Sequence, residues 1–489
     1  MIFVHLIGHN FEYEVREMIR VFFFNEEIQF IDDLKEYDEG ILIVSKFNNT
    51  FDKLASITQI YDDNQLVYDD HLDIDTIDIG RDDIHKKIRV GIITNLYNGL
   101  NRISPVKAPW GILTGVRPLK IVHDLLDKNY DYDSIIDILT KGYKLFSEKA
   151  ELLLNIAKKQ RKYLYPLDDR RFSLYIAIPF CPTRCVYCSF PSCSIDKFGH
   201  MVDMYTDKLI YEIDEIGKLM ADYNISTVYI GGGTPTAIPI KNLERIIQAV
   251  YRNFGKENIE EFTVEAGRPD TINYEMLSML KDNHIDRISI NPQTMNDRTL
   301  ELIGRKHTSS DIIDVYHMAK NIGFPVINMD LIVGLPAEGV KEIRTTLSMI
   351  EKLDPENLTV HTLAVKRGSK FKDIMDQYQL KEQNIINEML NETKIFAERM
   401  GLEPYYLYRQ KQMLGNFENI GYAKKDKECL YNIKMMEEKE TIIAAGMGAI
   451  SKIYYPQEDR IERVPNVKSL KEYIDRVDEM IEKKRSFLS

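Results

Sequence analysis

The sequence has few cysteines, no long apolar run and no surplus of basic residues, and each absence excludes a class of protein. Five cysteines in 489 residues are too few for a disulfide framework. No apolar run reaches the roughly 18 residues of a membrane span, so no transmembrane helix is expected. Lysine and arginine number 64 against 76 aspartate and glutamate, a net charge of −12. A nonspecific nucleic-acid binder shows the opposite balance.

The N-terminal segment, MIFVHLIGHNFEYEV, also lacks the features of a secretory signal. It has no basic start, and His5, His9 and acidic residues interrupt its apolar stretch. We therefore expect a cytoplasmic protein. In that compartment thiols stay reduced, so a cluster of cysteines typically binds metal.

What the sequence does contain divides it into three expected regions, residues 1–165, 166–367 and 368–489. The first is a mixed α+β extension, with runs at 40–47 and 85–100 that are strand-like followed by helix-like, and helical spacing at 119–140 and 148–164. Pro166 and the charged string DDRR mark its end. The third region, with a helix near 380–400, is expected to be mostly helical and to cover a substrate.

The middle region alternates apolar strands with amphipathic helices, which predicts parallel βα units. In such units ligands bind at the carboxyl ends of the strands, whether the sheet is open or forms a partial barrel. The expected helices include 202–220, 241–254 and 339–353. The expected strands are 173–179, 226–232, 260–266, 286–292, 326–334 and 357–364.

Three cysteines, Cys181, Cys185 and Cys188, follow the first of these strands within the string IPFCPTRCVYCSF. One interpretation is a zinc site completed by Cys193 or His200. The interpretation that we favour is three thiolates on a [4Fe–4S] cluster, with the fourth iron open to a ligand that is not protein. Cys193 and Cys429 are then ordinary thiols.

Later strands also end in groups suited to a small ligand. The second is followed by GGGTPT (231–236), whose glycines allow a close approach of backbone to ligand. Glu265, Gln293 and Asp330 lie at the next strand ends, and Arg305 follows closely. A carboxylate at a strand end is often a helix cap, but four polar groups on the same predicted edge favour a binding site.

These strings together resemble the radical S-adenosylmethionine superfamily and, within it, the family of oxygen-independent coproporphyrinogen III oxidase (dehydrogenase). The strings 108–120 (APWGILTGVRPLK) and 405–422 resemble its HemZ branch. The resemblance implies a partial (β/α)6 TIM-like barrel of the radical SAM type, a [4Fe–4S] cluster on the three cysteines, and S-adenosylmethionine as cofactor. It also implies contacts with S-adenosylmethionine for Tyr175, Tyr187, Gly232, Gly233, Thr234, Glu265, Gln293, Arg305 and Asp330.

The function implied is oxygen-independent oxidative decarboxylation of two propionates of coproporphyrinogen III to vinyl groups, with an electron donor such as flavodoxin or ferredoxin. Arg367, Arg409 and Lys411 are candidates for binding this tetrapyrrole's carboxylates. The sequence departs from the oxidase at Phe190, where the oxidase has cysteine, and at Ala177, where it has histidine. Tyr431 replaces a histidine of the heme chaperones. A heme-binding chaperone and a porphyrin methyltransferase or heme-degrading enzyme therefore remain alternatives.

Overall fold

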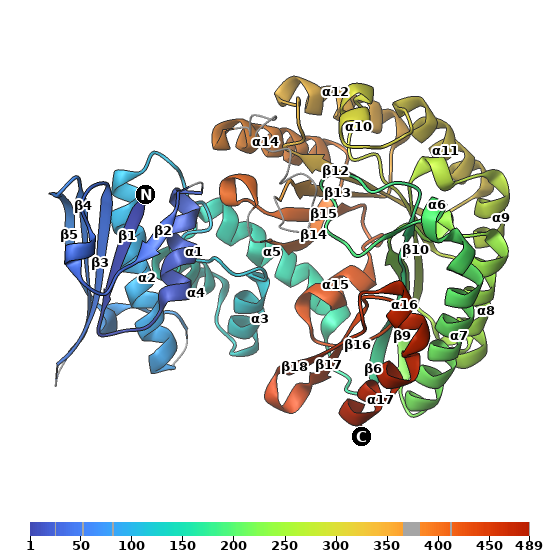
Figure 1. Cartoon of the computed structure of the whole chain (residues 1–489), viewed down its shortest axis with the longest axis horizontal. Coiled ribbons are helices and arrows are strands. Elements are labelled where there is room, and N and C mark those ends of the chain that lie inside the picture. Colours follow the sequence, from blue (N-terminus) through green and yellow to red (C-terminus); the bar gives the residue numbers. More distant parts are fainter. Residues whose placement is uncertain (25, 51–52, 81–82, 365–381, 411–412, 489) are drawn as a thin grey trace. The chain divides into compact units, whose positions relative to one another are not determined.

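The computed structural model describes residues 1–24, 26–50, 53–80, 83–364, 382–410 and 413–488 (Figure 1). They form two compact units. The first unit is Met1–Lys158 with Arg409–Glu418, and the second is Lys159–Tyr408 with Asn419–Ser489. The three-region division at residues 165 and 367 stays a prediction. Among the helices described, none is both long and apolar enough to cross a bilayer.

The first unit contains a five-stranded sheet in the order β2-β1-β3-β4-β5 (Figure 1). β1 pairs parallel with β2 and β3, whereas β3, β4 and β5 form an antiparallel meander. The strands are β1 (Ile2–Ile7), β2 (Ile28–Phe30), β3 (Ile41–Thr50), β4 (Lys53–Asp62) and β5 (Gln65–Asp73). Its helices are α1 (Glu12–Phe22), α2 (Ile84–Ile103), α3 (Leu119–Asp127), α4 (Tyr132–Asp137) and most of α5 (Ser147–Leu164).

The strand-like reading of the start of 85–100 is wrong, because the whole run lies in the single helix α2. Residues 90–97 of this helix are all buried, on every side of the helix. A helix covered all round has no polar stripe, so the 3.6-residue period that identifies a surface helix is lost.

Six parallel strands in chain order form the centre of the second unit, which confirms the predicted βα alternation and the partial barrel. The sheet has the order β14-β15-β13-β12-β11-β10-β9-β6-β16-β17-β18. The six central strands are β6 (Arg171–Ile178), β9 (Asn224–Gly232), β10 (Glu261–Gly267), β11 (Arg287–Ile290), β12 (Val326–Val333) and β13 (Asn357–Thr362).

Helices follow these strands and cover the outer side of the sheet (Figure 1). In α8 the buried residues Leu243, Ile246, Ile247 and Val250 form one apolar stripe at helical spacing. Since each helix returns the chain to the same end of the sheet, all six strands end at one rim. The helices are α7 (Val202–Leu219), α8 (Ile240–Phe254), α9 (Tyr274–Asp282), α10 (Asp297–Leu302), α11 (Ser309–Ile322) and α12 (Val340–Leu353).

The last part of the chain extends this sheet at both ends. β15 pairs antiparallel with β13, and β16 pairs parallel with β6. The strands are β14 (Glu403–Tyr408), β15 (Asn419–Ala423), β16 (Thr441–Ala445), β17 (Ile450–Tyr455) and β18 (Arg460–Pro465). The helices are α14 (Gln383–Arg399), α15 (Leu430–Glu437), α16 (Leu470–Asp475) and α17 (Val477–Leu488). The expectation of a mostly helical region missed these strands, partly because β16 is buried along its whole length and shows no alternation.

Candidate functional site

The three clustered cysteines lie in a loop that leaves the rim after β6. Cys181 ends the two-residue strand β7 (Phe180–Cys181), and the backbone N–H of Cys188 donates to the carbonyl of Cys185 at 3.1 Å. None of them forms a disulfide. Burial, with a smaller effect of the thiols of Cys188 and Cys185, raises the pKa of Cys181 to about 11. A bound metal would favour the thiolate form of Cys181, since metal binding displaces the thiol proton.

A buried arginine that sequence reasoning missed holds this loop in place. Arg268 is 4% exposed and donates to the carbonyl and the hydroxyl of Thr183, at 3.1 and 2.8 Å. The other side of its guanidinium makes two bonds to Asp270, at 3.0 and 2.8 Å. The string FTVEAGRPD contained both residues, but their charges gave no sign of a partner in the cysteine loop.

The donors present fit an iron–sulfur cluster better than a single ion. Within the part of the chain that the structure describes, no three Cys, His, Asp or Glu side chains are arranged to hold one metal ion. In a [4Fe–4S] cluster each thiolate binds a different iron, so its ligands need not meet at one point. His200 is exposed and Cys193 is buried beneath the loop, where its backbone N–H donates to Pro179.

The glycine run after β9 packs directly on the cysteine loop. A Cβ on Gly233 would lie 2.7 Å from the carbonyl oxygen of Phe180 and 3.0 Å from the sulfur of Cys181. Gly232 has φ +107°, a conformation that L side chains rarely adopt. The hydroxyl of Thr234 lies 3.5 Å from the sulfur of Cys181. The structure therefore brings Gly232, Gly233 and Thr234 together with the first cysteine.

Two carboxylates at the rim, Glu265 and Asp330, interact with each other but have different surroundings. Burial raises the pKa of Glu265 to about 7; a hydrogen bond from the Tyr229 hydroxyl opposes this rise, and the charge of Asp330 adds to it. Burial would also raise the pKa of Asp330, but His361, Asn328 and Thr359 hold it below the usual value. The rim thus contains one carboxyl, Glu265, that is partly protonated near neutral pH, and another, Asp330, that stays ionised.

Two backbone hydrogen bonds join Gln293 to β12, the strand that contains Asp330. Its N–H donates to the Asp330 carbonyl at 2.8 Å, its own carbonyl accepts from Ile332 at 2.9 Å, and its φ is +67°. Positive φ is uncommon for a residue other than glycine and is found where surrounding bonds impose it.

Three predicted contacts remain, Arg305, Tyr187 and Tyr175. Arg305 is 8% exposed and donates to the Asn291 carbonyl at 2.5 Å and to the hydroxyl of Tyr187 at 3.3 Å, which places both at the cysteine loop. The ring of Tyr175 stacks on Tyr229 and on Tyr431, each at 6.2 Å between ring centroids.

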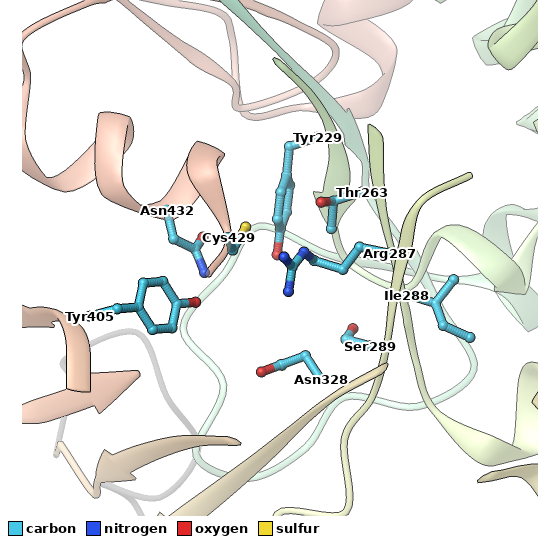
Figure 2. Close-up of a pocket in the computed structure, with 9 residues that line it drawn as sticks. All are labelled: Tyr229, Thr263, Arg287, Ile288, Ser289, Asn328, Tyr405, Cys429 and Asn432. Carbon is cyan, nitrogen blue, oxygen red and sulfur yellow. The ribbon is translucent and has the colours of Figure 1, made fainter. Parts of the chain in front are cut away.

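A polar cavity lies one layer below these groups, towards the amino ends of the strands. Thr263 and Asn328 precede Glu265 and Asp330 by two residues and so share their face of the sheet. Figure 2 shows the side chains of Arg287 and Tyr405 directed into this space. It is lined by Tyr229, Thr263, Arg287, Ile288, Ser289, Asn328, Tyr405, Cys429 and Asn432.

The three candidate substrate ligands are not brought together among the described residues. Arg367 and Lys411 lie outside the residues that the structure describes. Arg409 belongs to the first unit and is 3% exposed, and its guanidinium donates to the carbonyls of Leu113, Asn416 and Phe417. These bonds give Arg409 a structural role.

Comparisons with known proteins identify the family to which the chain belongs. Residues 175–350 match the family model described as "Radical SAM superfamily". The "oxygen-independent coproporphyrinogen-III oxidase-like protein HemZ" of Bacillus subtilis is 40% identical over 84% of this chain and 83% of its own length. The chain belongs to the oxygen-independent coproporphyrinogen-III oxidase-like family of radical SAM proteins. A [4Fe–4S] cluster and S-adenosylmethionine are the cofactors of this superfamily and hence of this protein.

Other relatives of this radical SAM protein carry two different names. "Heme chaperone HemW" of Bacillus subtilis is 30% identical over 63% of this chain and 76% of its own length. The solved structure of coproporphyrinogen III oxidase (HemN) from Escherichia coli, described as a radical SAM enzyme, is 25% identical. It matches with a TM-score of 0.52 over 66% of this chain and 73% of that chain. Family membership therefore does not by itself decide between oxidase and chaperone.

Proposed function

We propose that this radical SAM protein oxidatively decarboxylates propionate side chains of coproporphyrinogen III to vinyl groups, giving protoporphyrinogen IX without oxygen. Each propionate loses a hydrogen atom from its β-carbon, its carboxylate leaves as CO2, and one further electron passes to an acceptor. The observation that carries the proposal is the rim of polar groups around the cysteine loop, in a chain 40% identical to an oxidase-like protein along most of its length.

The cysteine loop and the rim have separate tasks in this proposal. Cys181, Cys185 and Cys188 hold the cluster, which when bound supplies the electron that cleaves S-adenosylmethionine and starts the radical chemistry. Gly232, Gly233 and Thr234 offer backbone groups next to the cluster, and the buried carboxylates and Arg305 orient the cofactor's charged groups. The protein's part in this chemistry is to bind and orient the reacting groups.

Tyr431 favours the oxidase over the chaperone. It occupies the position of a chaperone histidine, yet it is 4% exposed and its ring stacks on Tyr229 at 4.5 Å. A buried tyrosine in this stack is poorly placed to bind an iron from outside. The position therefore offers no heme ligand of the chaperone type.

Ala177 favours the second candidate, a heme-carrying role without oxidase activity. In place of the oxidase histidine, this alanine is 4% exposed and packs in a cluster with Ala444 and Ala449. Its carbonyl accepts from the hydroxyl of Tyr205 at 2.6 Å and would lie 2.4 Å from a Cβ on Gly446. The site thus has no room for the missing imidazole and no polar replacement at this position.

The test is an anaerobic incubation of cluster-reconstituted protein with S-adenosylmethionine, a reductant and coproporphyrinogen III. Release of CO2 with mono- and divinyl products is expected. Stable heme binding without cleavage of S-adenosylmethionine would establish the chaperone role instead, and a methylated or linearised porphyrin would establish the third alternative. We also propose a flavodoxin- or ferredoxin-like electron donor and a cytoplasmic location, since a low-potential cluster needs a reducing compartment.

A further inference from the structure

A histidine that neither the motifs nor the family resemblance singled out lies beside Asp330. His361 is on β13, next to β12, and its Nε2 lies 3.8 Å from Oδ2 of Asp330. The other ring nitrogen, Nδ1, lies 3.1 Å from the hydroxyl of Tyr408, the last residue of β14. The side chains of His361 and Asp330 are 25% and 20% exposed, so both are open in part to the rim.

This arrangement has one favourable hydrogen pattern in the neutral imidazole. The nitrogen that faces a carboxylate must carry the proton, which makes Nε2 the donor and Nδ1 the acceptor. The Tyr408 hydroxyl then donates to Nδ1, and Nε2–H points to Asp330. The opposite tautomer would place a lone pair against a carboxylate. Tyr408 therefore selects the form of His361 that stabilises negative charge on Asp330.

The other oxygen of Asp330 is also held. Oδ1 accepts a hydrogen bond from the side-chain amide of Asn328 at 2.7 Å. The titratable groups that face Asp330 are the carboxyl of Glu265, whose pKa the charge of Asp330 raises, and the imidazole of His361. The carboxylate is thus held by Asn328 on β12 and faced by His361 on β13, and Tyr408 on β14 acts on it through His361. It keeps a part-exposed edge for a ligand.

We propose that His361 and Tyr408 are positioning residues that hold Asp330 as an oriented anion for the cationic part of S-adenosylmethionine. This inference rests on the proposed function, because it assumes that S-adenosylmethionine binds at the rim. It adds a role for two residues, one on β13 and one on β14. S-adenosylmethionine carries a sulfonium and an ammonium group, so a fixed carboxylate at its site favours it over an uncharged nucleoside.

The test compares binding of S-adenosylmethionine with binding of 5′-methylthioadenosine, which keeps the adenine and ribose but has neither cation. Full-length, cluster-reconstituted protein is titrated with each ligand by calorimetry. For His361→Ala we expect affinity for S-adenosylmethionine to fall by about tenfold and affinity for 5′-methylthioadenosine to stay within about twofold. His361→Gln, whose amide can still donate to Asp330, should recover most of the loss. His317→Ala, at an exposed position on α11, is the matched control.

A second readout needs no cofactor. With ¹⁵N-labelled histidine, the His361→Ala variant identifies the His361 signals among those of ten histidines. We expect the Nε2–H tautomer in the wild type and a mixture of tautomers in Tyr408→Phe. Equal loss of both ligands in His361→Ala, no loss of either, no binding of S-adenosylmethionine by the wild type, or an Nδ1–H tautomer would overturn the proposal. Binding without turnover of coproporphyrinogen III would instead reject the proposed reaction alone.

Discussion

Charged side chains gather at the rim of the barrel and around Trp110 in the first unit, and the two regions use their charges differently. Trp110 is fully buried; its Nε1 donates to Glu418 at 2.8 Å, and Lys149 bonds to the other oxygen of Glu418 at 2.6 Å. Arg409 covers the same ring at 5.1 Å. In this Trp110 cluster, made of Trp110, Lys149, Arg409 and Glu418, the charged side chains bond to one another or to backbone groups.

At the rim, in contrast, the two carboxylates have no lysine or arginine partner in the part of the chain that the structure describes. The charge of Asp330 raises the pKa of Glu265, and no lysine or arginine forms an ion pair with either carboxylate among the described residues. Partly buried carboxylates without a lysine or arginine partner are costly and therefore mark a place where a cationic ligand completes the site. We therefore expect the charges at the rim to bind a ligand and those around Trp110 to stabilise the fold. Substitutions in each region test this difference.

The largest effect is expected at the cysteine loop. Cys185→Ser should abolish both iron loading and cleavage of S-adenosylmethionine, since a neutral hydroxyl does not replace a thiolate on iron. Iron content, the visible absorption of the cluster and release of methionine measure the outcome. Cys193→Ser, eight residues along the chain, should keep all three. Retention of cluster and cleavage in Cys185→Ser would refute the cluster assignment.

In the Trp110 cluster the effect should be on stability alone. Glu418→Ala leaves Lys149 without its carboxylate and the indole N–H of Trp110 without its acceptor, and should lower the free energy of unfolding by about 3–5 kcal/mol. Urea denaturation followed by tryptophan fluorescence is a direct probe, because the chain has a single tryptophan. Affinity for S-adenosylmethionine should be unchanged. A large loss of that affinity in a folded variant would show that the two regions are not separate in function.

A third test uses pH to compare two buried carboxyl groups. Burial raises the pKa of both Glu265 and Glu338 to about 7. The folded protein then binds more protons than the unfolded chain between about pH 4.5 and 7, so each group's contribution to stability is lost as pH rises through that window. Replacement of either by glutamine should flatten this loss by up to about 3 kcal/mol in cofactor-free protein.

Glu338 serves as the control because it lies against Thr294 and outside the predicted contacts. Glu265→Gln should weaken binding of S-adenosylmethionine, whereas Glu338→Gln should not. If both variants lost affinity equally, burial rather than position at the rim would explain the effect of Glu265.

Much of the barrel and its rim could be predicted from sequence because both have local signals. The six strands were expected within a few residues, since each is an apolar run followed by turn residues and an amphipathic helix. The cysteines, GGGTPT and the strand-end carboxylates were recognisable for the same reason. The role of Arg268 could not be found, because Thr183 is 85 residues away and a charged residue in a loop has no pattern that names its partner.

The strings 108–120 and 405–422 illustrate the same limit. Each is typical of one branch, and the sequence predicts substrate binding for Arg409 and Lys411 of the second string. The structure instead brings Arg409 and Glu418 together with the first string in the first unit, where the N–H of Arg409 donates to the carbonyl of Val116 at 2.8 Å and Trp110 donates to Glu418. Pairing between segments about 300 residues apart depends on the three-dimensional fold. Composition and spacing in either string do not reveal it.

The smallest expected effect decides the role of Arg409 itself. Arg409→Lys keeps the charge but loses the planar fork that reaches three backbone carbonyls, so the free energy of unfolding should fall by about 1–2 kcal/mol. Burial lowers the pKa of Arg409 to about 10, so a lysine in its place would be still easier to neutralise. If Arg409 only connects the segments 108–120 and 405–422, the variant should bind coproporphyrinogen III as tightly as the wild type does. Fluorescence quenching under anaerobic conditions measures this affinity. If tetrapyrrole affinity fell by more free energy than the stability did, Arg409 would have to bind the substrate. One buried charge of the first unit would then bind a ligand rather than stabilise the fold.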